Sequence, residues 1–390
     1  MLRVFFAFLK LGCTSFGGPA AHIGYFRAEF VERRKWLNEA SFADLVALCN
    51  FLPGPISTQI GMAVGISQAG IRGALAAWLG FSLPSAILML AFAYGFRELG
   101  SAASAGWLHG LKLAAVAIVA QAVWRMGRAL CPDPLRATVA VGAALLVSFW
   151  ATGVAQLAVI ALGALIGWRL LEASAPQSTG DLRFPIGRRA AMFAWILFLA
   201  LLVVLPVATR ATGNHAVALV DSFYRTGALV FGGGHVVLPL IRSAVVPPGW
   251  ISDGVFLEGY GAAQAVPGPL FTFAAYLGAV MSPQPNGVLG GLLCVAAISL
   301  PSFLLLIGAL PYWNALRNKA AVQSALKGVN ASVVGILLAA LYNPVWSSSI
   351  HDSRDFALAL ASFALLMFWK LSPVYVVLLA AAAGAAVAVA

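Results

Sequence analysis

The stretch TSFGGPAAH, residues Thr14–His22, decides the fold because a similar stretch, FGGGHVVLP at Phe231–Pro239, occurs in the second half of the chain. In both places Phe-Gly-Gly follows an apolar segment, and glycine tolerates backbone conformations that interrupt a helix. Further matches follow both copies in the same order: Trp36 and Trp250, Pro53-Gly54-Pro55 and Pro267-Gly268-Pro269, Ser82-Leu83-Pro84-Ser85 and Ser299-Leu300-Pro301-Ser302, Leu111-Lys112 and Leu326-Lys327. Their separation stays between 214 and 217 residues, which indicates an internal duplication.

The composition places both copies in a membrane. Of the 390 residues, 61% are hydrophobic and 9% are charged, whereas a soluble domain has about 25% charged residues. Apolar runs at 74–94, 137–150 and 190–207 approach the roughly 20 residues that a helix needs to cross a bilayer. The runs are continuous rather than alternating, which excludes a transmembrane β-barrel. We therefore predict an all-α polytopic membrane protein.

The repeat also sets the predicted domain boundaries. Residues 1–171 form the first copy, 172–207 a linker plus one transmembrane helix, and 208–390 the second copy. The segment 172–189 is polar and rich in Pro, Gly and Ser, as linkers are. Each copy is expected to hold two broken or re-entrant helical hairpins and about four crossings, near 73–96, 108–124, 137–151 and 153–170, and near 287–310, 323–343, 355–369 and 371–389. The additional crossing at 190–207 inverts the second copy relative to the first.

The net charge of +11 supports this topology. Basic residues stand in short clusters between apolar runs, as in cytoplasmic loops, so no nucleic-acid partner is expected. If each broken hairpin enters and leaves on one side, all but seven of the 24 basic residues fall on the side of the N-terminus. Five fall opposite and two within the membrane: Arg97, Arg210, Arg225, Arg242 and Arg354, and Lys112 and Lys327. We predict a cytoplasmic N-terminus and an inverted-topology repeat.

Both halves resemble the chromate ion transporter family in its long, duplicated form. The first half carries Phe16-Gly17-Gly18, Trp36-Leu37, Asn50-Phe51-Leu52-Pro53-Gly54-Pro55, Gln59-Ile60-Gly61 and the pair Gly70 and Gly73. The second carries Phe231-Gly232-Gly233-Gly234, Gln264-Ala265-Val266-Pro267-Gly268-Pro269 and Ser299-Leu300-Pro301. The resemblance covers nearly the whole chain. It implies a multi-pass protein of the bacterial inner membrane that exports chromate and confers chromate resistance, with the isostructural sulfate as competitor or counter-substrate.

Chromate is a tetrahedral dianion, and a helix broken within the membrane offers it free backbone N–H groups and a partial positive charge. Inverted-repeat transporters build their sites from such discontinuous helices. Expected substrate-binding residues at the four breaks are Ser15, Gly17, Gly18, Pro53, Gly54, Gly232, Gly233, Pro267 and Gly268. The alternative is that these are packing glycines and kink prolines, which are common in membrane helices.

Two matched pairs of charged residues are further candidates. Lys112 and Lys327 lie in otherwise apolar segments, where a charge costs about 2.5–3.5 kcal/mol and suggests a function. Either lysine could instead extend to the membrane interface, since both lie near the start of a helix. Asp44 and Glu258 could exchange protons and couple them to transport, form salt bridges to the lysines, or merely flank a half-helix.

Neutral and titratable groups near the breaks complete the predicted site. Asn50, Thr58, Gln264 and Thr272 could donate hydrogen bonds to the anion, although a threonine can also bond its own helix. His235 follows the second Gly-Gly and could contact the anion or sense pH, the alternative being an interfacial histidine with satisfied hydrogen bonds.

The sequence has no H-E-x-x-H, G-x-S-x-G or P-loop pattern, and no Ser–His arrangement near a break recurs in both halves, so an enzyme is not expected. The four cysteines have no metal-binding spacing, and neither a metal nor a cofactor is predicted. The favoured function is secondary, alternating-access export of chromate. A sulfate or general oxyanion transporter and an anion channel remain alternatives. Expected partners are chromate, sulfate and the lipid bilayer, and a homodimer is left open.

Overall fold

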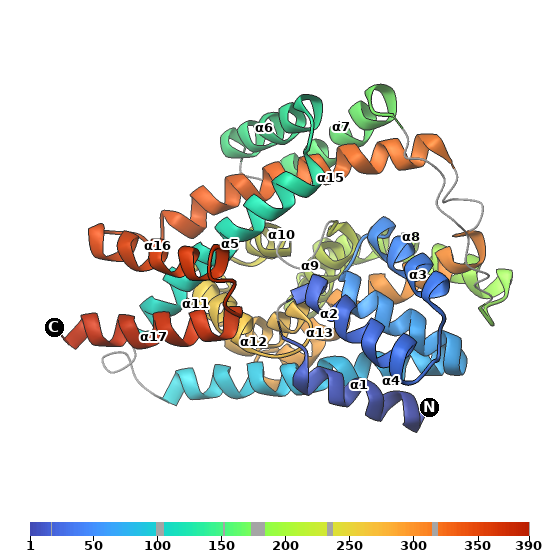
Figure 1. Ribbon diagram of the computed structural model, residues 1–390, viewed down its shortest axis with the longest axis horizontal. Coiled ribbons are helices and arrows are strands. Elements are labelled where there is room, and N and C mark those ends of the chain that lie inside the picture. Colours follow the sequence, from blue (N-terminus) through green and yellow to red (C-terminus); the bar gives the residue numbers. More distant parts are fainter. Residues whose placement is uncertain are drawn as a thin grey trace.

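The computed structural model describes residues 1–16, 18–98, 105–150, 153–172, 184–231, 237–313 and 319–389. Across these ranges the backbone is almost entirely helical and contains no β-strand (Figure 1). The predicted all-α fold is confirmed.

The first half begins with short helices and continues with longer ones. Its elements are α1 (Leu2–Thr14), α2 (Gly18–Arg27), the π-helical turn η1 (Ala28–Arg33), α3 (Glu39–Phe51), α4 (Ile56–Glu98), α5 (Ala105–Leu130), α6 (Pro134–Phe149) and α7 (Gly153–Leu170). Most of the predicted linker, residues 173–183, lies outside the described residues. Helix α8 (Arg188–Thr212) then joins the halves.

The second half repeats this order of short and long elements. It consists of α9 (His215–Leu229), α10 (Val237–Val245), α11 (Asp253–Ala265), the 3₁₀ turn η3 (Leu270–Thr272), α12 (Phe273–Val280), α13 (Gly287–Ala309), the 3₁₀ turn η4 (Leu310–Tyr312), α15 (Ala320–Ala340), the π-helical turn η5 (Leu341–Trp346), α16 (Ser353–Met367) and α17 (Pro373–Val389). Matched residues cap α3 and α11, since Asn38 accepts from the Ser41 N–H and Ser252 accepts from the Val255 N–H.

Helix α4 corresponds to both α12 and α13 of the second half. Its backbone leaves the helical conformation at Ala69 and at Gly70, which has φ +60° and ψ −152°. Glycine adopts this φ without the steric cost that a Cβ brings. In the second half, the chain passes through residues 281–286 between α12 and α13. In each half, the short helix after Pro-Gly-Pro is thus separated from the following long helix, by the kink at Gly70 in the first half and by residues 281–286 in the second.

The short helices form hairpins, as ring contacts between their arms show. Phe8 of α1 lies 5.7 Å from Phe26 of α2, centroid to centroid. Phe256 of α11 lies 5.2 Å from Phe273 of α12 in the same way. Helix α1 has 13 residues, which span about 20 Å at 1.5 Å per residue, whereas the hydrocarbon core is about 30 Å thick. Such arms are too short to cross it alone.

The last two helices of each half pack against the other half. Helix α5 contacts α16 and α17, and α15 contacts α6 and α7. In Figure 1, α5 and α15 lie side by side and run in opposite directions. Glycines permit the close crossings: a Cβ on Gly328 would collide with the carbonyl of Gly163, and one on Gly110 with the carbonyl of Ala380.

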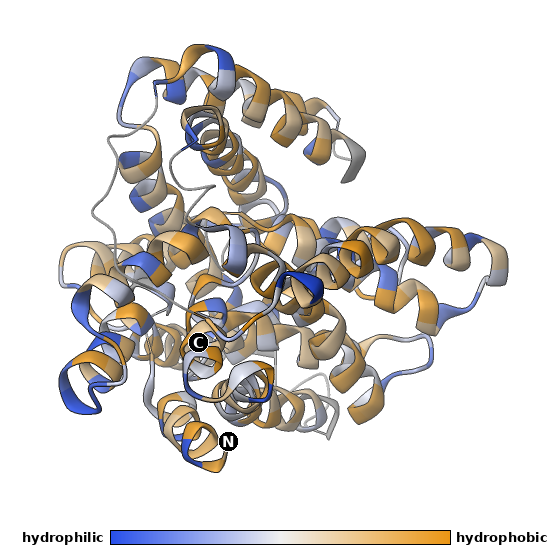
Figure 2. Ribbon diagram, turned by 90° about the vertical axis from the view of Figure 1, so that its right-hand side faces the viewer, coloured by the Kyte–Doolittle hydropathy of each residue, from blue (hydrophilic) through white to orange (hydrophobic). Residues whose placement is uncertain are grey.

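Five helices of the described residues are long and apolar enough to cross a membrane: α4, α5, α8, α13 and α15. Helix α8 is the least buried of these, with only 17% of its most apolar window inside the protein. Its exposed side chains between residues 191 and 207 are apolar, among them Phe193 and Val203, and Figure 2 shows that apolar residues make up much of the outer helices. Apolar outer surfaces of this kind suit contact with lipid, and the chain is a multi-pass membrane protein.

Candidate functional site

The breaks of the two halves meet through a reciprocal pair of backbone hydrogen bonds. The Gly54 N–H in the first Pro-Gly-Pro donates to the carbonyl of Val230, which precedes the second Phe-Gly-Gly, at 2.6 Å. The Gly268 N–H in the second Pro-Gly-Pro donates to the carbonyl of Ser15, which precedes the first Phe-Gly-Gly, at 2.8 Å. The two donors, Gly54 and Gly268, occupy repeat-related positions, and so do the two acceptors, Ser15 and Val230. The sequence duplication therefore becomes a two-fold arrangement around one centre.

Gly54 and Gly268 are required at these positions for two reasons. Their φ angles are +129° and +100°, in the region that side chains with a Cβ rarely adopt. A Cβ on Gly54 would collide with the hydroxyl of Ser302, and one on Gly268 would lie 2.9 Å from the hydroxyl of Ser85. Ser85 and Ser302 are themselves repeat-related, and each belongs to the half opposite its glycine. Two serines thus reach across to the breaks.

Free backbone donors follow the Pro-Gly-Pro breaks. Gln59 N–H bonds the Pro55 carbonyl, and Thr272 N–H bonds the Pro269 carbonyl. The N–H groups of Ile56, Ser57, Thr58, Leu270 and Phe271, which stand between these donors and acceptors, begin helices and have no acceptor among the described residues. These are the donors available to an anion at the breaks, because the N–H groups of Gly54 and Gly268 are already used.

Buried polar side chains without partners surround the same breaks. Ser15, Gln59 and Ser302 are fully buried and Thr58 is 3% exposed. Among the described residues, four of their oxygens and one amide nitrogen of a half-buried glutamine lack any hydrogen bond: Ser15 Oγ, Thr58 Oγ1, Gln59 Oε1, Ser302 Oγ and Gln264 Nε2. Buried polar groups without partners cost roughly 1–3 kcal/mol each. A cluster of them around two helix starts is typical of a site that a ligand completes.

Several predicted residues satisfy their hydrogen bonds locally. The Thr272 hydroxyl donates to the Pro269 carbonyl at 2.8 Å, and exposed Asn50 donates to the Val46 carbonyl at 2.7 Å. The Pro53 carbonyl accepts from Gln59 Nε2 at 2.7 Å. Gly18 begins α2 with φ +76° and open space around it, and Pro267 is buried. Four predicted residues lie outside the described ranges: Gly17, Gly232, Gly233 and His235.

Lys112 and Glu258 form an ion pair between the halves. Lys112 Nζ of α5 lies 2.8 Å from Glu258 Oε1 of α11, with side-chain exposures of 18% and 10%. The second carboxylate oxygen, Glu258 Oε2, is buried without a hydrogen bond among the described residues. Of the roles considered for Glu258, the structure thus contains the salt bridge. The Glu258 carboxylate therefore has one oxygen in the salt bridge and one oxygen free to accept a hydrogen bond.

The repeat-related residues have different surroundings. Lys327 Nζ donates to the carbonyl of Glu172, just beyond the end of α7, at 2.7 Å. A cation at the C-terminal end of a helix is stabilised by the helix dipole. Asp44 is buried in α3 at 5% exposure. The two halves are therefore related in sequence but not identical in their charge pairing.

Sequence reasoning missed some residues that line the breaks. Gln59, Ser85 and Ser302 belong to motifs that recur or carry the family resemblance, but nothing in the motifs predicts that each reaches a break. Free backbone N–H groups are expected at the breaks, but the glycine motifs do not indicate that these groups stand at Ile56 and Leu270. Their signal is the Pro of Pro-Gly-Pro, which stands immediately before the first free N–H of each helix.

The breaks thus offer hydroxyl, amide and backbone N–H donors in a buried setting without a full positive charge of their own. Hydrogen bonds from neutral donors to an ionised acceptor are strong in a medium of low dielectric. A tetrahedral oxyanion has four acceptor oxygens, and the donors approach from both halves. Each of these donors can form a non-covalent hydrogen bond of the kind that a tetrahedral oxyanion accepts.

Comparison with known proteins places the chain in a family. The sequence profile of the family described as chromate transporter matches twice, over residues 2–168 and 217–385. A chromate transport protein of Pseudomonas aeruginosa is 30% identical over 98% of this chain and 91% of its own length. The chromate transport protein of Cupriavidus metallidurans is 26% identical over 97% and 90%. An uncharacterised transporter of Methanocaldococcus jannaschii is 25% identical over 87% and 83%. No solved structure matches the chain. With two profile matches that together cover most of its length, the chain belongs to the chromate transporter family, in the long form that carries the domain twice.

Proposed function

We propose that the protein exports chromate from the cytoplasm and holds the dianion at the four breaks, between the two halves. The observation that carries this proposal is the reciprocal pair of hydrogen bonds, Gly54 to Val230 and Gly268 to Ser15. These bonds bring the free N–H groups of two helix starts to one centre. Unpartnered hydroxyls of Ser15, Thr58 and Ser302 adjoin it.

Neutral donors suit an ion that must leave again. A fixed arginine would bind a dianion tightly by a bidentate contact, whereas serine hydroxyls and backbone N–H groups share the charge among several weaker bonds. Export is also favoured energetically. An inside-negative potential contributes about 2.3 kcal/mol per charge per 100 mV, hence about 4.6 kcal/mol for a dianion.

The Lys112–Glu258 pair is the proposed link to a coupling ion. An anion near Lys112 would compete with Glu258 for the ammonium group, and protonation of Glu258 would release that group. Because the pair joins α5 of the first half to α11 of the second, its opening would also loosen one contact between the halves. Proton movement and movement of the halves would then be connected. Asp44 is the corresponding candidate in α3.

Alternating access follows from the duplication in this proposal. Two copies with opposite orientation can exchange conformations, so that the one centre opens to each side in turn. The unequal pairing of Lys112 and Lys327 fits one such asymmetric state.

The direct test is flux into liposomes. Purified protein is reconstituted, and uptake of labelled chromate and labelled sulfate is measured under imposed pH and voltage gradients. Saturable chromate flux that responds to voltage and shows counterflow is expected. Absence of chromate flux alongside robust sulfate flux would refute the assignment to chromate, and flux that neither saturates nor shows counterflow would indicate a channel.

Sulfate transport is the second candidate, and the same donors support it. Hydroxyl and backbone N–H groups recognise the shape and charge of a tetrahedral dianion, which chromate and sulfate share. A competition experiment measures the selectivity between the two ions. The tighter the protein binds sulfate, the more strongly a given excess of sulfate inhibits chromate flux. A protein selective for chromate would keep most of its flux under a large excess of sulfate.

A further inference from the structure

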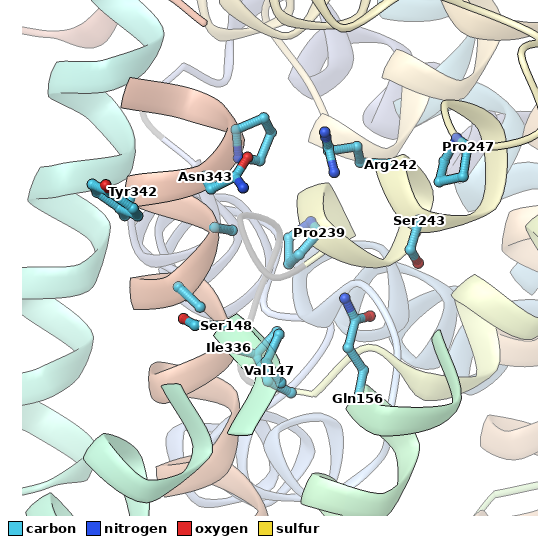
Figure 3. A pocket seen from close by; sticks show the side chains of 13 residues that line it. Val147, Ser148, Gln156, Pro239, Arg242, Ser243, Pro247, Ile336, Tyr342 and Asn343 are labelled. Carbon is cyan, nitrogen blue, oxygen red and sulfur yellow. The ribbon is translucent and has the colours of Figure 1, made fainter. Parts of the chain in front are cut away.

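A cavity of about 120 Å³, lined by none of the described residues of the four breaks, lies where four helices and a π-helical turn come together. Its walls come from the end of α6, the start of α7, the length of α10, and the end of α15 with η5 (Figure 3). The volume is far above the roughly 10–15 Å³ that one water molecule requires, so a small polyatomic ion fits.

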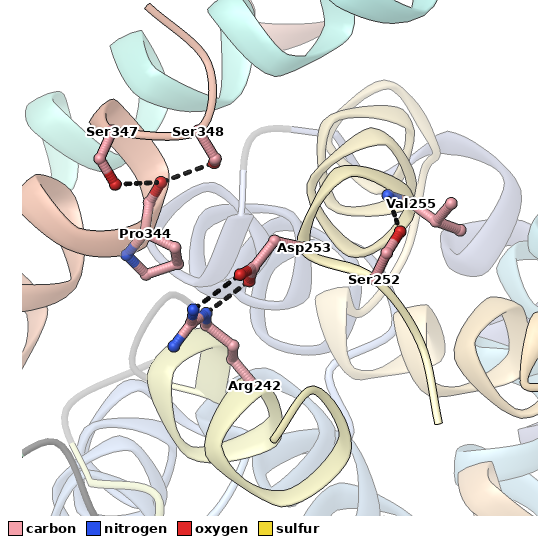
Figure 4. A network of polar contacts seen from close by, with 7 residues as sticks. All are labelled: Arg242, Ser252, Asp253, Val255, Pro344, Ser347 and Ser348. Atoms are coloured by element: carbon pink, nitrogen blue, oxygen red, sulfur yellow. Dashed lines mark hydrogen bonds and ion pairs between the residues drawn. The ribbon is translucent and has the colours of Figure 1, made fainter. Parts of the chain in front are cut away.

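Arg242 of α10 is the charged residue that lines this cavity. Asp253, the first residue of α11, holds its guanidinium by two bonds, from Nε at 2.6 Å and from Nη2 at 2.8 Å. A guanidinium has five N–H donors, and both N–H groups of Nη1 have no acceptor among the described residues. In Figure 4 the third nitrogen lies on the side away from Asp253. Asp253 thus fixes the arginine and leaves one edge of it free.

Gln156 of α7 supplies a second unused group. Its side chain is 5% exposed, and Oε1 has no hydrogen-bond partner among the described residues. Figure 3 shows its amide rising toward Pro239 and Ser243 of α10. Rotation of the terminal amide presents either its oxygen or its NH₂ group to the cavity. Gln156 can therefore donate to a ligand that Arg242 holds.

The serines of the wall have no hydroxyl hydrogen left to donate to an anion, and no carboxylate among the described residues of the wall repels one. Ser148 and Ser243 already donate their single hydroxyl hydrogens to the carbonyls of Ala144 and Leu240. No carboxylate lines the cavity among the described residues, since Asp253 lies behind the guanidinium. Tyr342 and Asn343 also line the cavity but are exposed, so its free donors away from solvent are one edge of a cation and one primary amide. Such a pair matches two neighbouring oxygens of a tetrahedral oxyanion.

We infer that this cavity is a second oxyanion-binding site, separate from the four breaks, with Arg242 and Gln156 as its donors and Asp253 as the residue that positions Arg242. The inference rests on the proposed function in taking the transported class of ion as its ligand. The wall residues near 148–156, 242–247 and 339–344 belong to segments that the charge distribution assigns to the outer side of the membrane. On that topology the site lies toward the side of the membrane at which an exported anion leaves.

The first half supplies a matched control. Arg27 and Glu39 occupy the positions related to Arg242 and Asp253 by the repeat, and Arg27 Nε donates to Glu39 at 2.7 Å. There, however, Nη1 donates to a second carboxylate, that of Glu32, at 2.6 Å. The Arg27 side chain is also 47% exposed. Arg27 is thus held by two carboxylates and exposed to solvent, and their two negative charges oppose the binding of an anion there.

Equilibrium binding of labelled sulfate to the purified full-length protein tests the inference, since sulfate is stable and carries the same charge and shape. We expect Arg242→Gln to weaken one binding component at least tenfold, and Gln156→Leu to weaken the same component about threefold. Arg27→Gln should leave sulfate binding within twofold of the wild type. Gel filtration and the thermal midpoint of each variant establish that it is folded.

Gln156→Leu keeps the test decisive if Arg242→Gln fails to fold, because it does not touch the ion pair. Unchanged sulfate binding in a folded Arg242→Gln or in Gln156→Leu would overturn the inference, as would an equal loss in Arg27→Gln. Failure of the proposed function is separable: Gly54→Ala should remove the component that belongs to the breaks and preserve the one that needs Arg242. A protein without chromate flux that still loses sulfate binding in Arg242→Gln would retain this site and lose only the transport assignment.

Discussion

Gly54 combines two constraints that act at a single residue. Its backbone has φ +129°, and the space where a Cβ would stand is occupied by Ser302 and Gln59. Its N–H also holds the Val230 carbonyl of the opposite half at 2.6 Å. Residues forced into such a conformation cost roughly 1–3 kcal/mol. The glycine thus determines both the shape of its break and the contact between the halves.

Replacing Gly54 by Ala is therefore expected to reduce chromate flux at least tenfold, because the added methyl displaces Ser302 and lengthens the bond to Val230. The measurement is flux into liposomes at equal protein content. Gly127→Ala is the control, since open space surrounds that glycine and flux should be unchanged. Full activity of Gly54→Ala would show that the break tolerates a shift and that the reciprocal bonds are dispensable.

Lys112 and Glu258 form the second residue-scale feature with a clear consequence. Removing one partner of a buried ion pair costs about 3–5 kcal/mol, because the other charge stays behind without compensation. Lys112→Gln and Glu258→Gln should each lower the thermal midpoint, and the double variant should recover part of the loss. Thermal unfolding in detergent measures this, and additive losses in the double variant would argue against a direct pair.

A role in coupling predicts more than a loss of stability. Glu258→Gln removes the proton-binding group, so chromate flux should lose its dependence on an imposed pH gradient while keeping its dependence on voltage. Flux measured with and without each gradient separates the two. A variant that retains the wild-type response to the pH gradient would transfer the coupling role to another carboxylate, with Asp44 the first to test.

At the scale of elements, the exchange of helices between halves is the main feature of the fold. Helices α16 and α17 cover α5, while α6 and α7 cover α15, so each half completes the other. The crossings are close because Gly163, Gly167 and Gly328 face one another, as do Gly110 and Gly384. In a membrane the hydrophobic effect does not drive helices together. Van der Waals packing at such close backbone crossings drives their association instead.

Gly328→Leu should consequently lower the thermal midpoint and reduce the yield of folded protein, because its side chain would meet the backbone of α7. Overpacking of this kind costs about 1–3 kcal/mol. Gly127→Leu is the matched control, as that glycine lies in a helix but faces open space. Equal midpoints for the two variants would contradict the tight crossing of α7 and α15.

Much of the element-scale description could be predicted, and the residues show why. The positions of α5, α13 and α15 follow from apolar length, and the first residues of α3 and α11 follow from the N-caps Asn38 and Ser252. The exchange of helices could not be predicted, since an apolar face indicates burial but not the partner that buries it. The bond from Gly54 to Val230 was missed for the same reason, because no local pattern identifies a carbonyl in the other half.

At the scale of the whole molecule, the duplication relates two ion pairs. Arg27 with Glu39 and Arg242 with Asp253 each join the end of one hairpin to the start of the next. Their settings differ, since the first is exposed and the second adjoins the cavity between α7 and α10. If the halves are inverted, these pairs lie on opposite sides of the membrane. A conformational change that buries the first pair and exposes the second would then switch the side from which the centre is accessible.

Side-specific cysteine labelling tests the inversion. Glu32 lies in the π-helical turn η1 and Pro248 in the turn after α10. Both are exposed and stand between repeat-related helices, so they should face the cytoplasm and the exterior respectively. The four native cysteines, Cys13, Cys49, Cys131 and Cys294, are first replaced, which leaves Glu32→Cys or Pro248→Cys as the single thiol. A membrane-impermeant maleimide applied to intact cells should label Pro248→Cys and should label Glu32→Cys only after permeabilisation. Labelling of both from the same side would make the halves parallel. Alternating access could then not arise from an exchange of conformations between inverted copies. The concentration of basic residues around Arg27 would also need an explanation other than a cytoplasmic location.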